Sequence, residues 1–111
     1  MLIKPASEVK FIEQYLEDNF VSFPEKNPIK KGIQRAINRL KENVFCGERI
    51  EKRLIPKEYI LKYDIDNLWW YPLPDGWRLV YSIATNESEI LAIIIEYFDH
   101  KNYAKRFGYK K

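Results

Sequence analysis

The chain has 111 residues, of which 46% are hydrophobic and 15% aromatic. This length suits one compact domain spanning residues 1–111 and is short for two ordinary domains. The most apolar run, residues 90–95, is far shorter than the roughly 20 residues that a membrane span needs, and the N-terminus does not resemble a signal peptide. We therefore expect a single-domain, soluble, cytoplasmic protein that does not contact a membrane.

The charge is unevenly distributed, although the formal net charge is only +3. Residues 30–53 contain eight Lys and Arg against three Asp and Glu, and residues 98–111 contain five against one. Basic blocks of this kind suit a polyanion such as RNA, or an acidic protein partner. A solvated helix face followed by a frayed tail would carry the same charges, so both interpretations stay open.

The sequence contains no familiar cofactor motif. Its four glycines are scattered and form no phosphate-binding loop, so no nucleotide cofactor is indicated. Cys46 and His100 are the only cysteine and histidine, which excludes an intramolecular disulfide and argues against a transition-metal site. We interpret Cys46 as a small, partly buried hydrophobic residue, and we expect neither a cofactor nor a metal.

The N-terminal region is predicted to hold a short edge strand and a first helix. Leu2–Ile3 forms the strand, which Pro5 ends because proline lacks the N–H group that a ladder needs. The helix is capped by Ser7 and extends through Asn19, with apolar residues at helical spacing.

A second, strongly amphipathic helix is predicted to begin at Asn27, a good N-cap, with Pro28 at its first position. Apolar residues recur at helical spacing from Ile29 to Val44, and Gly47 is placed to end the helix. Its polar face carries most of the first basic block, namely Lys30, Lys31, Arg35, Arg39 and Lys41. Two such helices bury their apolar stripes by packing on a sheet.

The C-terminal half is predicted to be mostly strand. Residues 55–63 suit a helix of one to two turns opened by Pro56 or an irregular strand, and we favour the helix. An aromatic strand over residues 67–73 follows, in which Pro72 implies an edge or a bulge. Residues 76–83 and 90–95 then form a hairpin around a polar turn, and the second strand is apolar at every position, as expected of a central strand buried on both faces. The predicted class is α+β, with two N-terminal helices packed on an antiparallel sheet.

The end of the chain gathers the residues with the clearest chemical potential. Arg78 is a permanent cation in an otherwise apolar hairpin, and His100 follows the last strand. Cleaving RNA without a metal requires a base, an acid and cations that hold the charge of the phosphorane. His100 is the candidate acid or base, and Arg78 is the candidate phosphate ligand. Further candidates are Tyr103 and Tyr109 for proton donation or base stacking and Lys101, Lys105 and Arg106 for the RNA backbone.

Each of these residues also has a structural interpretation. His100 can simply close the end of the strand, and Arg78 can pair with Glu96 on the neighbouring strand. The three tryptophans between residues 69 and 77 suit a core or a partner surface better than a base-stacking platform. The basic tail can be a disordered end.

Two segments resemble the RelE/ParE superfamily of toxins from type II toxin–antitoxin systems. GWRLVYSI at residues 76–83 is similar to the superfamily's strand with a G-x-R-x-x-Y pattern. EYFDHKNYAKRFGY at residues 96–109 contains an H-K-x-Y-x-K form similar to the HigB-like and RelE-like branches. The order of two helices followed by an antiparallel sheet also agrees, so the resemblance covers the whole chain.

The resemblance implies a RelE-like microbial RNase fold, with two helices packed on a twisted antiparallel sheet. It implies a metal-independent endoribonuclease that cuts mRNA, commonly on the ribosome, and a cognate antitoxin protein that neutralises it. By position, Arg78 resembles the phosphate-binding arginine. His100 resembles the acid, base or phosphate contact at the exit of the last strand, and Tyr103 resembles the tyrosine that follows.

The sequence also departs from the superfamily pattern. RelE-like members often carry further lysines on the strand before the arginine strand, whereas residues 67–73 carry none. ParE relatives inhibit gyrase and are not ribonucleases. The alternative is therefore a non-catalytic ParE-like gyrase inhibitor, or an inactive relative that only binds an antitoxin. In each case we expect the antitoxin to cover the second helix and the basic tail.

Overall fold

Five strands form one mixed, open sheet in the order β1-β5-β4-β3-β2. The structure is a computed structural model that describes residues 2–108. The strands are β1 (Glu8–Phe11), β2 (Glu48–Arg49), β3 (Trp69–Pro72), β4 (Arg78–Thr85) and β5 (Ile90–Phe98). β2, β3, β4 and β5 pair antiparallel, whereas β1 runs parallel to β5. The expectation of a purely antiparallel sheet is therefore wrong, because β1 adds a parallel edge.

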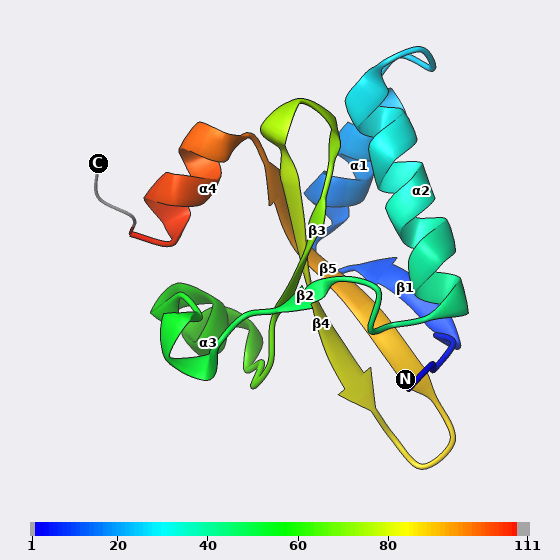
Figure 1. Cartoon of the computed structure of the whole chain (residues 1–111), viewed down its shortest axis with the longest axis vertical. Coiled ribbons are helices and arrows are strands. Elements are labelled where there is room, and N and C mark those ends of the chain that lie inside the picture. Colours follow the sequence, from blue (N-terminus) through cyan, green and yellow to red (C-terminus); the bar gives the residue numbers. More distant parts are fainter. Residues whose placement is uncertain (1, 109–111) are drawn as a thin grey trace.

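Helices cover both faces of this sheet, and the predicted α+β class is confirmed (Figure 1). The helices are α1 (Gln14–Ser22), α2 (Pro28–Glu42), α3 (Lys57–Tyr63) and α4 (His100–Arg106), with short 3-10 turns at η1 (Lys52–Leu54) and η2 (Pro74–Gly76). α1 and α2 lie on one side of the sheet, and α3 and α4 lie on the other. Within residues 2–108, no helix has the length and apolar character needed to cross a membrane.

The N-terminal prediction is wrong in detail. Residues Glu8–Phe11 form β1 instead of the first turns of a helix, and Leu2–Ile3 forms no strand. Exposed and half-buried residues alternate along β1, which is the period of a strand. The Ser7 hydroxyl accepts a hydrogen bond from the Ile90 N–H at 3.2 Å and so ties β1 to β5 instead of capping a helix. Pairing with a distant apolar strand decides the local conformation here.

The predicted start of α2 is confirmed, and its predicted end is wrong. The Asn27 side chain accepts hydrogen bonds from the backbone N–H groups of Ile29 and Lys30, at 2.8 and 3.3 Å. The helix ends at Glu42 and is followed by an extended Asn43. Gly47 therefore has another role: a Cβ there would lie 2.5 Å from the Trp70 carbonyl oxygen, so this position admits only a glycine.

β3, the β4–β5 hairpin and the short helix α3 agree with the sequence predictions, whereas β2 and α4 were not predicted. α3 follows Pro56 directly, and the β4–β5 hairpin closes around a polar turn. β5 has a neighbour on each side, as expected of an interior strand. Pro72 pairs with Arg78 of β4 and lies beyond the part of β3 that pairs with β2, so its missing N–H faces no partner strand.

Two hydrophobic clusters lie on opposite faces of the sheet. Leu79 and Tyr81 of β4 enter the first cluster, under α1 and α2, and Val80 between them enters the second, under α3 and α4. Val80 pairs with Glu96 and Tyr81 with Ile94, so β5 has a β-bulge with Ile95 as its extra residue. All three of these β4 side chains are fully buried.

The buried hydroxyl of Tyr81 joins β4 to the loop between α2 and β2. It donates to the Val44 carbonyl oxygen at 2.7 Å and accepts from the Gly47 N–H at 3.0 Å. Tyr81→Phe leaves both backbone groups without a partner, so we expect the free energy of unfolding to fall by about 1–3 kcal/mol. Chemical denaturation measures this change.

Tyr71→Phe is the matched control, since the Tyr71 hydroxyl makes no hydrogen bond within residues 2–108. It should change the free energy of unfolding by no more than about 0.5 kcal/mol. Equal effects of the two substitutions would show that the Tyr81 hydrogen bonds contribute nothing to stability.

Candidate functional site

The candidate residues meet where β4 begins and β5 ends. Arg78 opens β4 directly opposite Phe98, the last residue of β5. Asp99 then caps α4 by accepting a hydrogen bond from the Asn102 N–H at 2.9 Å, and His100 is the first residue of this helix. A Cβ added at Gly76, two residues before Arg78, would lie 3.9 Å from the His100 Cβ. The fold therefore brings Arg78 and His100 to the same end of the sheet.

The guanidinium of Arg78 lies between two aromatic rings. Its central carbon is 4.1 Å from the centroid of the Trp70 ring and 4.5 Å from that of the Tyr103 ring. Within residues 2–108, no carboxylate lies within ion-pair distance of it. The proposed pairing with Glu96 is thus wrong. Both rings contact the guanidinium carbon, and the Arg78 side chain makes no hydrogen bond within residues 2–108, so its N–H donors are available to bind an anion.

Tyr103 lies in the second hydrophobic cluster. It is 2% exposed, with its ring edge-on to Phe98 at 5.5 Å and stacked on Phe107 at 4.4 Å between centroids. One turn of α4 separates Tyr103 from Phe107, so the helix builds this stack by itself. In this buried position the Tyr103 ring can orient Arg78, whereas its hydroxyl is poorly placed to donate a proton to a substrate.

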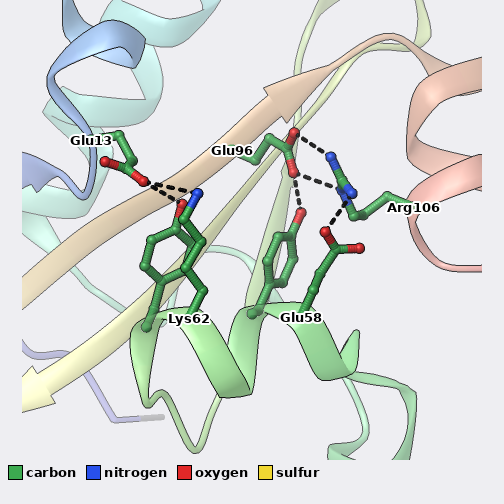
Figure 2. A network of polar contacts seen from close by, with 7 residues as sticks. Glu13, Glu58, Lys62, Glu96 and Arg106 are labelled. Atoms are coloured by element: carbon green, nitrogen blue, oxygen red, sulfur yellow. Dashed lines mark hydrogen bonds and ion pairs between the residues drawn. The ribbon is translucent and has the colours of Figure 1, made fainter.

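Arg106 is bound by two carboxylates (Figure 2). Its guanidinium donates to Glu96 at 3.1 and 3.2 Å and to Glu58 of α3 at 2.7 Å. The Tyr59 hydroxyl donates a further hydrogen bond to Glu96. Hydrogen bonding to Glu96 raises the pKa of Arg106. Arg106 therefore fixes α4 to β5 and α3, and its charge is compensated there.

A further carboxylate, that of Glu13, anchors the C-terminal end of α3, as Figure 2 also shows. Glu13, in the β1–α1 connection, pairs with Lys62 at 3.2 Å and accepts from the Tyr63 hydroxyl at 3.0 Å. Hydrogen bonds from Tyr63 and Lys62 lower the pKa of Glu13. α3 is therefore bound near its start to Glu96 of β5 and at its end to Glu13.

The other predicted site residues are solvent-exposed or outside the described part. His100, Lys101 and Lys105 are exposed on α4. Tyr109 lies outside residues 2–108. A shallow depression beside α4 is lined by Glu96, Phe98, Asn102, Lys105 and Arg106. In the same part of the chain, no three His, Cys, Asp or Glu side chains are grouped so that they could hold a metal ion.

Sequence reasoning missed Trp70 as the second ring on Arg78. Trp70 pairs with Val80 and Pro72 pairs with Arg78, so Trp70 and Arg78 are diagonal neighbours on one face of the sheet. The hairpin register of the two strands would have revealed this. The carboxylates around Arg106 had no comparable signal, because Glu58 lies 48 residues away.

Comparisons of the chain with protein family models, with curated proteins and with solved structures found no match.

Arg106→Gln tests whether Arg106 serves the fold. The substitution leaves Glu96, which is 18% exposed, without its cation. Because hydrogen bonds to charged groups are lost, we expect the free energy of unfolding to fall by about 1–3 kcal/mol. Lys105→Gln, at the adjacent exposed position of α4, is the control and should change it by no more than about 0.5 kcal/mol. If Arg106→Gln leaves the free energy of unfolding unchanged, Arg106 does not serve the fold and is a candidate RNA-binding residue.

Stability should fall at alkaline pH because of buried and half-buried tyrosines. Burial raises the pKa of Tyr97 to about 12 and also raises the pKa of Tyr59 and Tyr81, from an ordinary value of 10.0. The folded state favours the neutral phenol, so this stability is fully present below pH 10 and is lost as the pH rises toward 12. Tyr97→Phe, which also removes the hydrogen bond to the Leu16 carbonyl oxygen, should reduce the slope of this loss. Denaturant unfolding across the pH range measures it, and identical slopes would contradict the assignment.

Proposed function

We propose that this protein is a toxin of the RelE/ParE type and acts as a metal-independent endoribonuclease on mRNA, with Arg78 as the phosphate ligand and His100 as an acid or base. One observation carries the proposal: the Arg78 guanidinium is held by the rings of Trp70 and Tyr103, at the same end of the sheet as His100 and with no carboxylate partner within residues 2–108. An oriented cation of this kind is what a developing phosphorane needs.

The chemistry divides between Arg78 and His100. In RNA cleavage the 2′-oxygen attacks the phosphorus and the 5′-oxygen leaves, so one proton is removed and another is supplied. Histidine exchanges protons near neutral pH, and His100 is exposed at the start of α4. Arg78 would donate its in-plane N–H groups to the non-bridging oxygens. The aromatic rings fix the guanidinium before the substrate binds, which lowers the cost of ordering it.

The exposed cations of α4 support RNA binding next to this site. Lys101 and Lys105 are exposed and would contact backbone phosphates. Arg106 would act only by holding α4 in position, because its charge is already compensated by Glu58 and Glu96.

The architecture supports the proposal in outline. Two helices early in the chain pack on one face of the sheet, and β3, β4 and β5 form an antiparallel run, as the resemblance implies. The resemblance extends the proposal to the partners: a cognate antitoxin, mRNA and the ribosome, in the cytoplasm.

A second candidate is a non-catalytic ParE-like gyrase inhibitor or an inactive relative that only binds an antitoxin. The burial of Tyr103 favours it, because Tyr103 is 2% exposed and packs between other rings. Of the three predicted catalytic residues, only His100 is an exposed group that can exchange a proton. A site with one such residue is poorer in acid–base groups than the reaction requires.

Inducing the wild type and the double variant Arg78→Ala/His100→Ala in a bacterial host tests both candidates. Growth and the 5′-ends of mRNA are read together, with Lys57→Ala as a control that removes an exposed cation of α3. We expect growth arrest with new mRNA ends in the wild type and the control, and neither in the double variant. New ends that persist in the double variant would refute the assigned site, and arrest without new ends would favour the gyrase inhibitor.

The single variant Arg78→Lys separates charge from geometry. Lysine keeps the positive charge but loses the planar fork and the stacking on both rings. We therefore expect a cleavage rate about 100-fold below that of the wild type, as for removal of one transition-state donor. A wild-type rate would show that Arg78 acts only as a point charge.

A further inference from the structure

The solvent face of α2 carries a row of cations. Lys31, Arg35 and Arg39 are spaced four residues apart and are all exposed. Each step rises about 6 Å along the helix axis, which is similar to the distance between successive phosphates of an extended strand. The exposed amides Gln34 and Asn38 lie between them and are hydrogen-bonded to each other at 3.1 Å. We call these five residues the α2 face.

The fold does not use these charges. Lys30, beside the α2 face, is held by the Val21 and Phe23 carbonyl oxygens and by Glu25. Within residues 2–108, Lys31 and Arg35 take part in no ion pair, and Arg39 reaches only Glu42, at 4.0 Å. Lys31 also lies in the first turn of α2, where the helix dipole disfavours a cation. The sequence thus keeps positive charge there at some cost to the helix.

The composition of the α2 face fits a phosphate backbone better than a protein partner, which argues against the expectation that the antitoxin covers this helix. Residues 28–41 contain no Asp or Glu. The large hydrophobic side chains that the structure exposes, Leu2, Ile3, Tyr15, Val21, Leu54, Ile60 and Leu61, all lie outside α2. A protein interface normally has an apolar centre, whereas backbone phosphates need only cations and hydrogen-bond donors.

The α2 face is connected to the candidate site through the turn between β3 and β4. A Cβ added at Gly32 of α2 would lie 2.4 Å from the Pro74 Cδ, so helix and turn are in close contact. Gly76 in the same turn lies against His100, as described above. Figure 1 shows this turn between α2 and α4. To reach Arg78, on the opposite face of the sheet, a strand bound along α2 would pass over this turn and its exposed Asp75.

We propose that the α2 face is a second, sequence-independent binding surface for the phosphate backbone of the RNA strand whose other part reaches Arg78 and His100. Two parts of this inference rest on the proposed function: that the bound polyanion is RNA, and that its strand leads from α2 to Arg78 and His100. The backbone contacts themselves require only the cations of α2.

The test uses a fluorescent, single-stranded, 2′-O-methylated RNA, which keeps the phosphates and lacks the hydroxyl needed for cleavage. Its affinity for the full chain is measured by anisotropy at several KCl concentrations. The triple variant Lys31→Gln/Arg35→Gln/Arg39→Gln should bind more weakly, and the slope of log Kd against log salt should fall by about 2, as expected for three lost phosphate contacts on a single strand.

The matched control replaces Arg49, Lys52 and Arg53 by Gln, which removes the same number of exposed arginines and lysines from another surface. We expect less than half of the slope change in this control. Equal slopes for the two triple variants would overturn the proposal, and so would competition by polyglutamate as strong as by RNA, which would indicate an acidic protein partner. A DNA strand that binds with the same slope would support backbone recognition. No cleavage step enters this measurement, so a failure of the proposed nuclease is detected separately by the induction experiment.

Discussion

The burial of β4 and β5 on both faces is the constraint on which the rest of the structure depends. Leu79 and Tyr81 enter one hydrophobic cluster, and Val80 and Ile95 enter the other. A strand pair that is apolar on both sides needs helices on both sides. α1 and α2 cover one face, so α3 and α4 must cover the second, and this requirement brings α4 back over the end of β5. The candidate site exists because α4 lies there.

Two arginines at this end of the molecule show how surroundings decide what a charge can do. Arg106 is 34% exposed and is bound by Glu58 and Glu96, so its charge is used in holding α4 to β5 and α3. Arg78 is held by Trp70 and Tyr103 instead. Aromatic rings orient a guanidinium and attract it without neutralising it. Arg78 therefore combines a fixed position with an available charge, a combination that suits anion binding.

The tertiary structure also relates the two basic blocks of the sequence. Most of the first block lies on α2, and the described cations of the second block, Lys101, Lys105 and Arg106, lie on α4; these helices pack on opposite faces of the sheet. The turn between β3 and β4 contacts both helices, through Pro74 and Gly76. This turn contributes no lysine or arginine between residues 73 and 77 and exposes Asp75, so it separates the two basic surfaces.

The sequence by itself determined the α+β class, the start of α2 and the β4–β5 hairpin, and it favoured the short helix after Pro56 over an irregular strand. These features rest on local signals: the Asn27-Pro28 cap, helical spacing, turn residues and a continuous apolar strand. Only the tertiary structure decided that residues 8–11 pair with β5, which lies about 80 residues further along the chain, and that carboxylates from two other elements hold Arg106. It likewise decided that Tyr103 is buried and that Trp70 covers Arg78. Such pairings depend on which surfaces meet after folding, and local periodicity carries no information about them.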